Sequence, residues 1–226
     1  DMVIKSALKL VSDAYSPAIF SLSTFESGTR AEESTRKAHE TTRDLATNPF
    51  IHLYENILLP SENWEDYDVV GISIIGISQI IPGLTLARMV KEKYPHLHLT
   101  LGGPIFSVNA GQLTGHPEFF DDFCHSIVTF EGEEPMHRLL SALKAGDSLK
   151  TVPNLLHLDG REVVQNKERV ELRFEELPNP VFDGLPMDKY LSPYPIIPVL
   201  QSRGCYWGKC TFCTHSFVYG HRYGKQ

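Results

Sequence analysis

The sequence predicts an α/β fold, and two observations lead to that prediction. Residues 69–75 (Val-Val-Gly-Ile-Ser-Ile-Ile) form a continuous apolar run rich in β-branched residues, which is typical of a strand buried on both faces of a parallel sheet. Segments with strand and helix patterns then alternate up to about residue 145, as they do in α/β domains. We therefore expect a Rossmann-like, doubly wound parallel sheet whose loops gather at the carboxyl edge of the strands.

The first sixty residues predict two helices joined by an extended segment. Apolar residues recur at helical spacing in residues 1–15, and Pro17 ends this helix. Residues 18–25 read as a short strand or extended loop. Residues 32–45 carry dense charge in a helical pattern, which Asn48 and Pro49 bring to an end.

After the first apolar strand, predicted helices and strands alternate along the chain. An amphipathic helix is predicted at 82–93, with Pro82 in its first turn, where the missing N–H is harmless. The next strand, at 98–101, ends in Gly102-Gly103-Pro104. The remaining expected elements are a helix near 108–113, a strand at 126–130, a turn at 131–133 and a helix at 135–145.

The character of the chain changes after Gly146. Residues 155–158 and 162–164 flank Asp159-Gly160, which predicts a β-hairpin. Prolines then recur through residues 176–198, at Pro178, Pro180, Pro186, Pro193, Pro195 and Pro198, as in an extended connector. A further strand is expected at 196–201. The predicted domains are thus residues 1–146, a hairpin and connector at 147–195, and a third segment at 196–226.

Composition excludes several function classes. The 226 residues are 42% hydrophobic and 22% charged with a net charge of -7, an ordinary globular composition. The absence of a Lys/Arg-rich run argues against a nucleic-acid partner. The best apolar stretch, residues 69–84, is broken by glycines, Gln79 and Pro82, so no membrane span is expected. The chain opens at Asp1 without a signal peptide, which leads us to expect a processed N-terminus and a cytoplasmic location.

Three of the four cysteines, Cys205, Cys210 and Cys213, lie on one short segment. Cysteines so close in sequence make poor disulfide partners, whereas their thiolates can converge on a metal. Three thiolates can bind three irons of a 4Fe–4S cluster and leave the fourth iron open to a substrate. Gly204 and Gly208 would let the loop wrap tightly. A zinc site is the alternative, and His215 would then supply the fourth ligand that zinc requires.

The segment Arg-Gly-Cys-Tyr-Trp-Gly-Lys-Cys-Thr-Phe-Cys at residues 203–213 resembles the signature of radical S-adenosylmethionine enzymes. The gap between the first two cysteines is one residue longer than in the commonest pattern, and it resembles a variant with this Tyr-Trp-Gly-Lys filling. The resemblance implies a 4Fe–4S cluster on these cysteines, bound S-adenosylmethionine and an external electron donor. Phe212, an aromatic residue just before the last cysteine, is expected to shield the cluster and to meet the adenine.

The preceding part of the chain, from about residue 64, resembles the cobalamin-binding domain found before the barrel in one class of these enzymes. The matching stretches are Asp68-Val-Val-Gly-Ile-Ser73, Leu101-Gly-Gly-Pro104, Phe130-Glu-Gly-Glu133 and Phe182-Asp-Gly-Leu-Pro186. The resemblance implies that the cofactor is contacted by Ser73, Ile75, Gly76, Ser78, Gly102, Gly103, Pro104, Glu131 and Gly132. Small residues at strand ends also open a crevice where α/β folds bind ligands.

Some of these residues also have a purely structural interpretation. Gly-Gly-Pro after a strand is commonly a turn, and Ser73 can satisfy a backbone group. The Asp-x-His-x-x-Gly motif, whose histidine ligates cobalt in the best-known cobalamin domains, is absent. The absence of this motif has three possible explanations. Cobalamin binds without a protein ligand to cobalt, the first strand lies upstream of Asp1, or the site has lost its ability to bind cobalamin. Cys124 and His125 are predicted to be a core cysteine and a strand-end residue rather than metal ligands.

The resemblance also implies a reaction. In the intact enzyme the cluster would cleave S-adenosylmethionine to a 5′-deoxyadenosyl radical, and methylcobalamin would methylate an unactivated carbon of a peptide or natural product. Peptide maturation is the branch that the Tyr-Trp-Gly-Lys variant resembles. The radical barrel would need on the order of 150 further residues, so we expect this chain to be an inactive fragment that carries only the barrel's first strand and cluster loop. The alternatives are a radical enzyme that uses cobalamin for ring formation or rearrangement or does not use it at all, a non-catalytic cobalamin-binding or sensing module, and a zinc protein.

Overall fold

The computed structural model describes residues 2–190, 192, 194–219 and 224–225, which leaves Pro193 of the predicted connector outside the described residues. The chain divides into two compact units, residues 1–169 and residues 170–226. In the described part of the chain, no helix has both the length and the apolar character needed to cross a membrane.

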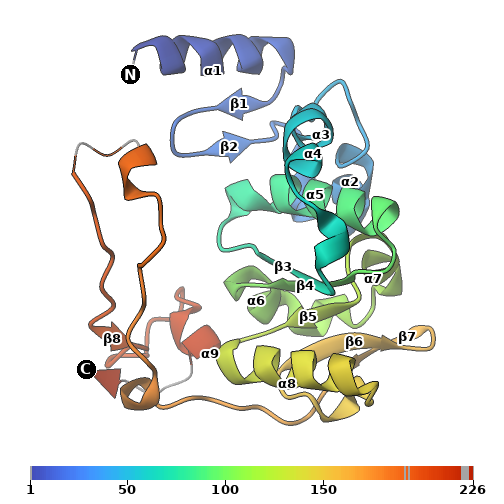
Figure 1. Ribbon diagram of the computed structural model, residues 1–226, viewed down its shortest axis with the longest axis vertical. Coiled ribbons are helices and arrows are strands. Elements are labelled where there is room, and N and C mark those ends of the chain that lie inside the picture. Colours follow the sequence, from blue (N-terminus) through green and yellow to red (C-terminus); the bar gives the residue numbers. More distant parts are fainter. Residues whose placement is uncertain (1, 191, 193, 220–223, 226) are drawn as a thin grey trace. The chain divides into compact units, whose positions relative to one another are not determined.

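The first unit contains seven strands and the larger helices (Figure 1). Its strands are β1 (Ile19–Phe20), β2 (Phe25–Glu26), β3 (Val69–Ser73), β4 (His98–Gly102), β5 (Ser126–Val128), β6 (Leu155–Asp159) and β7 (Glu162–Gln165). Its helices are α1 (Met2–Ala14), α2 (Thr35–Thr41), α3 (Phe50–Leu53), α4 (Leu59–Ser61), α5 (Ile80–Lys93), α6 (Pro104–Leu113), α7 (Pro117–Phe123) and α8 (Glu133–Ala145). Short helical turns are η1 (Ala31–Glu33), η2 (Tyr54–Leu58), η3 (Trp64–Asp66), η4 (Ile77–Gln79) and η5 (Leu149–Thr151).

The five-stranded sheet has the order β3-β4-β5-β6-β7, so its strands follow one another in chain order (Figure 1). β3, β4 and β5 are parallel, whereas β6 runs antiparallel to β5, and β7 antiparallel to β6. The sheet is therefore mixed, which corrects the expectation of a wholly parallel sheet. The predicted hairpin at 155–164 forms, but it extends the sheet instead of following it as a separate element.

Burial explains why the hairpin joins the sheet. Leu155 and Leu156 are both fully buried although their side chains point to opposite faces. Leu156 packs in the core formed with α5, α6 and α7, while Leu155 packs with Leu139 of α8. Each fully buried leucine contributes about 2 kcal/mol, and an isolated hairpin could bury only one of its faces. Helices thus cover both faces of the sheet, with α8 on the opposite face from α5.

The core on the α5 face comes from the periodicities that the sequence shows. In α5, Leu84, Ala87 and Val90 are buried at spacings of three residues, as expected for one face of a helix. In β4, Leu99 and Leu101 alternate onto the same face and are fully buried. The predicted helices at 82–93, 108–113 and 135–145 and the strands at 69–75, 98–101 and 126–130 are confirmed within a few residues.

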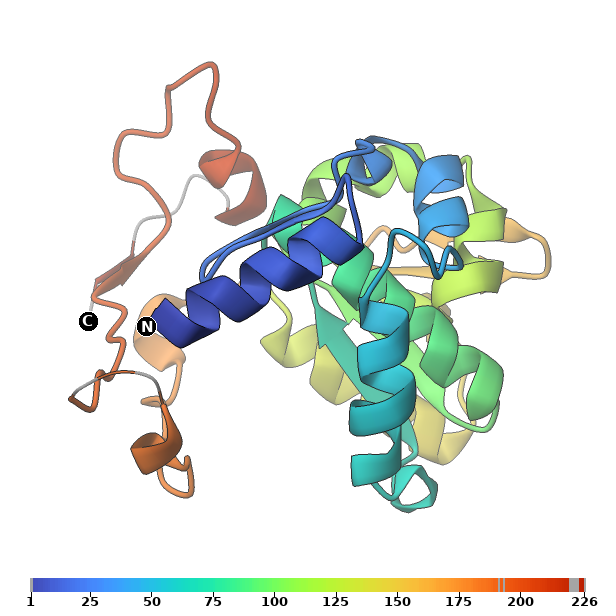
Figure 2. The same cartoon turned by 90° about the horizontal axis from the view of Figure 1, so that it is seen from above.

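The N-terminal part departs from prediction in two places. The helix predicted at 32–45 is shorter, with η1 and α2 followed by turns, and Pro49 precedes α3 instead of ending a helix. The helical segments between residues 50 and 61 and α7 were not expected. The N-terminal helix α1 is confirmed and runs beside the β1–β2 hairpin (Figure 2), where the Ser12 hydroxyl accepts a hydrogen bond from the Phe20 N–H at 2.8 Å.

The short helix α7 is held at its C-terminal end by one lysine from α5. The Lys91 ammonium donates hydrogen bonds to the main-chain carbonyls of Phe120, Asp121 and Cys124. The last turn of a helix leaves carbonyls without helical partners, and a cation is favoured at the negative end of the helix dipole. The Phe120 carbonyl also accepts a hydrogen bond from the Cys124 N–H at 3.2 Å. The capping residue Lys91 lies on another helix, outside residues 117–123. The local sequence therefore does not predict α7.

The second unit consists of short elements. They are η6 (Phe174–Glu176), η7 (Met187–Lys189), β8 (Ser202–Arg203), α9 (His215–Tyr219) and β9 (Gly224–Lys225). β8 pairs antiparallel with β9. The strand predicted at 196–201 as the first strand of a barrel is not formed, because a strand requires a hydrogen-bonded neighbour and these residues have none in the described part of the chain.

Candidate functional site

A cavity of about 300 Å³ opens on the α8 face of the sheet, toward the carboxyl ends of β3, β4 and β5. We call it the sheet-edge cavity. It is lined by Gly71, Ile72, Ser73, Thr100, Leu101, Gly102, Gly103, Val128, Phe130, Gly132 and Met136. Alternation along the strands places Gly71 and Ser73 of β3 beside Thr100 and Gly102 of β4 on this face. The cavity exists because four neighbouring positions on one face carry small side chains.

Two of the glycines create space and a third is required by the backbone. A Cβ at Gly71 would lie 3.7 Å from Thr100 Cγ2, and one at Gly102 would lie 3.5 Å from the Val128 carbonyl oxygen. Side chains would therefore be tolerated there sterically, but they would occupy the cavity. Gly103 has φ of 112°, and a Cβ there would lie 2.2 Å from the Ile74 carbonyl oxygen. Only glycine fits where β4 turns into α6.

The structure brings together four of the nine residues that the cobalamin-domain resemblance implied. Ser73, Gly102, Gly103 and Gly132 line the sheet-edge cavity. The other five lie elsewhere around the same sheet edge and do not line it, namely Ile75, Gly76, Ser78, Pro104 and Glu131. The N–H groups of Ile75 and Gly76 donate to the Gln79 side chain, which holds this loop. Cofactor contacts by all nine residues stay predictions.

Sequence reasoning missed the walls of the cavity. Gly71 and Thr100 could have been found from strand alternation, because each lies two residues before a predicted site residue. Phe130 lies in the quoted stretch at 130–133 but was not predicted as a contact, and Met136 gave no signal, since its place depends on how α8 packs. Phe130 has φ of 59°, its N–H donates to the Ser107 hydroxyl at 2.7 Å, and the Arg169 guanidinium lies 3.8 Å above its ring.

A chain of polar side chains leads from the amino end of β4 to the sheet-edge cavity. His98 Nε2 lies 2.9 Å from the Ser126 hydroxyl oxygen, and that hydroxyl donates to Thr100 Oγ1 at 3.0 Å. Ser126 and Thr100 are buried. Burial, followed by the charge of His125, lowers the pKa of His98 to about 4. The imidazole is therefore neutral at neutral pH.

This buried imidazole predicts a pH dependence of stability. An unfolded histidine titrates near pH 6.5, whereas the folded pKa of His98 is about 4, so the unfolded chain binds more protons between these values. We expect the free energy of unfolding to fall by about 1–2 kcal/mol from pH 7 to pH 5 on account of His98, and its contribution to level off below about pH 4. Urea unfolding at both pH values measures this. His98→Gln keeps an N–H donor and should flatten the dependence, and an unchanged slope would contradict the assignment.

Cys124 and His125 are confirmed as packing residues. Cys124 is fully buried, and burial raises the pKa of its thiol, which stays protonated. His125 Nδ1 accepts a hydrogen bond from the Leu99 main-chain N–H at 2.9 Å, which fixes the neutral ring at the start of β5. Burial also lowers the pKa of His125.

The three clustered cysteines lie in the second unit, all with free thiols. Cys205 is half-buried and accepts a hydrogen bond from the Gly208 N–H at 3.4 Å, while Cys210 and Cys213 are exposed. Gly204 and Gly208 have φ of 85° and 60°, so both predicted loop glycines adopt the conformation that glycine favours. We call residues 203–213 the cysteine loop. Phe212 lies at its surface and is 88% exposed.

The donor set of the cysteine loop suits an iron–sulfur cluster. Free, accessible thiols are the ligands that such clusters take, and glycines at both bends let one short loop present three of them. As placed here, the thiols do not converge: among the described residues, no three His, Cys, Asp or Glu side chains are close enough to hold a metal ion. His215 begins α9, and its ring lies 4.7 Å from that of Tyr219. Both the cluster and the zinc alternative stay predictions.

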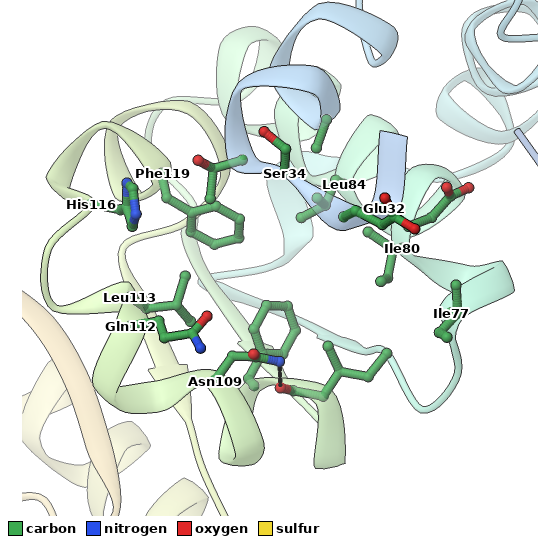
Figure 3. A pocket seen from close by; sticks show the side chains of 15 residues that line it. Glu32, Ser34, Ile77, Ile80, Leu84, Asn109, Gln112, Leu113, His116 and Phe119 are labelled. Carbon is green, nitrogen blue, oxygen red and sulfur yellow. Dashed lines mark hydrogen bonds between the residues drawn. The ribbon is translucent and has the colours of Figure 1, made fainter. Parts of the chain in front are cut away.

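A second cavity, of about 510 Å³, lies on the other side of the sheet between η1, α2, α5, α6 and α7 (Figure 3). Its apolar walls include Ile80, Leu84, Leu113 and Phe119, with Glu32, Gln112 and His116 among its polar groups. The Glu32 carboxylate already accepts hydrogen bonds from the N–H and hydroxyl of Ser27. None of the residues predicted from the sequence lines this cavity.

No protein family model matches the chain. An uncharacterized methyltransferase of Pyrococcus horikoshii is 31% identical over 163 residues, which are 70% of this chain and 34% of that protein. The chain thus spans about a third of the length of the curated relative that it matches.

Two solved structures of TsrM from Kitasatospora setae, a radical S-adenosylmethionine methyltransferase, are similar in part. The structure with cobalamin and a [4Fe-4S] cluster is 18% identical with a TM-score of 0.48, covering 84% of this chain and 40% of that one. The structure with tryptophan and a S-adenosylmethionine analogue is 19% identical with a TM-score of 0.47, covering 78% and 34%. With TM-scores this low, the fold assignment rests on the strands and helices of this chain alone.

Proposed function

We propose that this chain is part of a cobalamin-dependent radical S-adenosylmethionine methyltransferase. In this proposal the sheet-edge cavity of the first unit receives the nucleotide tail of cobalamin, and the cysteine loop of the second unit holds a 4Fe–4S cluster. The 31% identity to an uncharacterized methyltransferase supports the enzyme class. The substrate is proposed to be a peptide or natural product, and a separate protein or reagent supplies electrons.

The sheet-edge cavity is the observation that carries the cobalamin proposal. Its position at the carboxyl ends of parallel strands is where α/β folds bind ligands. Four residues that the sequence resemblance implied as cofactor contacts line it, although they come from three separate segments of the chain. Its volume is at the lower end of the range for small-molecule pockets, which suits one heterocycle and not a whole corrin ring.

The chemistry divides between the cofactors and the protein. When bound, the cluster with S-adenosylmethionine supplies a carbon radical and cobalamin supplies the methyl group. Cys205, Cys210 and Cys213 bind three irons as thiolates, while Gly204 and Gly208 shape the loop around them. Phe130 and Met136 line the sheet-edge cavity with apolar side chains, which keep water from a bound heterocycle. Gly71 and Gly102 keep the cavity open.

Titration of the chain with hydroxocobalamin, followed by visible absorbance, tests the cobalamin proposal. We expect saturable binding with one cobalamin per chain. The spectrum should show release of the cofactor's own lower ligand, because its nucleotide tail is captured by the protein. Gly71→Val should weaken binding roughly tenfold or more, because its side chain fills space that the ligand needs.

Gly111→Ala on α6 is the matched control, since a Cβ there meets no atom within 4 Å and binding should be unchanged. Failure of the folded chain to bind cobalamin would refute the proposal. It would leave the first unit as a scaffold or substrate-recognition unit in a radical enzyme that does not use cobalamin. If Gly71→Val binds cobalamin as tightly as the wild-type chain, the cofactor binds at a site other than the sheet-edge cavity.

A further inference from the structure

The second cavity carries charge of one sign. The described residues that line it include Glu32 and Glu33 of η1 but no lysine or arginine. Its remaining titratable side chain is His116, whose Nδ1 lies 2.7 Å from a carboxylate oxygen of Glu118, so that a positive charge on this ring is already balanced. An anionic ligand would meet carboxylates that repel it. The charges of the second cavity therefore favour a cation.

The Glu32 carboxylate is held in place without being neutralised. Its Oε1 accepts a hydrogen bond from the Ser27 N–H at 3.3 Å, and its Oε2 accepts one from the Ser27 hydroxyl at 2.9 Å. Ser27 is only 3% exposed, so the group that holds Glu32 belongs to the protein core. Within the described ranges, no lysine, arginine or histidine side chain pairs with Glu32. A carboxylate accepts up to about four hydrogen bonds, so acceptor positions stay open to a ligand.

The wall of the second cavity is apolar and well packed. It is formed by four core side chains from three helices, each at most 6% exposed, namely Leu84, Phe106, Leu113 and Phe119. Figure 3 shows Glu32 near Ile80 and Ile77 at one end of this cavity, with His116 at the other. Ile77 is 70% exposed, so the end with the carboxylate opens to solvent. An occupant therefore needs an apolar body with a positive charge at one end.

We propose that the second cavity binds a small amphipathic amine, whose ammonium group donates to the Glu32 carboxylate and whose apolar body packs against Phe106 and Phe119. A volume of about 510 Å³ suits a ligand of this size. The carboxylate is already oriented by Ser27, so little side-chain entropy is lost when the ligand binds. The site lies on the opposite side of the sheet from the sheet-edge cavity, and the inference does not depend on the cobalamin proposal.

The test compares three ligands of similar shape that differ in the charge at one end, namely phenethylamine, 2-phenylethanol and 3-phenylpropionate. Titration of the ¹⁵N-labelled chain, followed by NMR, measures each affinity and identifies the amides that shift. We expect phenethylamine to bind saturably and about tenfold more tightly than 2-phenylethanol, because its ammonium forms a charge-assisted hydrogen bond. The anion 3-phenylpropionate should show no saturable binding. The shifted amides should be those of η1, α6 and α7.

Two glutamate variants assign the binding to one carboxylate. Glu32→Gln keeps the shape of the side chain and an oxygen that can accept from Ser27, and it removes the charge. It should weaken phenethylamine binding about tenfold and leave 2-phenylethanol binding unchanged. Glu40→Gln on α2 is the matched control, because Glu40 is exposed, pairs with Arg36 and does not line the cavity. This variant should bind phenethylamine as the wild-type chain does.

Three results would overturn the assignment. They are equal affinities of the wild-type chain for phenethylamine and 2-phenylethanol, an unchanged phenethylamine affinity in Glu32→Gln, and failure of the folded wild-type chain to bind phenethylamine at all. The comparison of ligands uses the wild-type chain, so it decides the question even if Glu32→Gln does not fold. Each result is independent of whether the chain binds cobalamin.

Discussion

Replacing Cys205, Cys210 and Cys213 together by alanine is expected to abolish iron binding after anaerobic reconstitution with iron and sulfide. The three thiols are free and lie on one loop whose two glycines have positive φ, and thiolates are the ligands through which proteins hold 4Fe–4S clusters. Single replacements should each lose most of the iron, because two thiolates cannot hold a cluster that needs three. Iron and sulfide analysis of the desalted chain measures the effect, together with the brown colour of the cluster.

Two variants make this result specific. Cys124→Ala is the matched control, because Cys124 is fully buried and its thiol stays protonated, so iron uptake should be unaffected. His215→Ala separates the cluster from the zinc alternative, in which His215 supplies the fourth ligand. A chain that binds zinc, stays colourless and loses its metal in His215→Ala would contradict the cluster assignment.

Gly103→Ala is expected to destabilise the first unit by about 3 kcal/mol or more. The residue has φ of 112°, which side chains rarely adopt, and the new Cβ would lie 2.2 Å from the Ile74 carbonyl oxygen. Either β4 or the segment after β3 must move to relieve this contact, and both border the sheet-edge cavity. Urea unfolding followed by far-ultraviolet circular dichroism measures the loss.

Gly76→Ala is the control for this prediction of stability. Gly76 has φ of −127° and open space where a Cβ would lie, so its replacement should change the free energy of unfolding by no more than about 0.5 kcal/mol. Comparable losses in the two variants would mean that the close approach of Gly103 to Ile74 is absent in solution.

The parts of the fold with a strong local signal could be predicted. The apolar run of β3 and the alternation of β4 depend on residues close in sequence, and both strands form where expected. The hairpin of β6 and β7 was also visible, but its pairing with β5 was not. A strand's partner is decided by which buried faces it completes, and Leu155 and Leu156 contact layers formed by residues far away in sequence.

The candidate site divides in the same way. Ser73 and the glycines after β4 and β5 were found because they lie in short motifs. Thr100 was missed because it lies outside the motif at residues 101–104, and only strand alternation places it beside Gly71 on the cavity face. The turn and helix after Phe130 were predicted, but the positions of Phe130 and Met136 in the cavity depend on how α8 packs on the sheet, which the sequence pattern does not give. The cysteine loop was predicted from residue types and spacing alone, which cannot give the positions of its thiols.

The most direct test of the proposed function is metal analysis of the chain after anaerobic reconstitution with iron, sulfide and hydroxocobalamin, followed by desalting. The proposal predicts about four irons and one cobalt per chain, one cluster on the cysteine loop and one cobalamin at the sheet-edge cavity. Cobalt without iron would indicate a non-catalytic cobalamin-binding module, and iron without cobalt would indicate a radical enzyme that does not use cobalamin. Either result would contradict the assignment of a cobalamin-dependent radical methyltransferase.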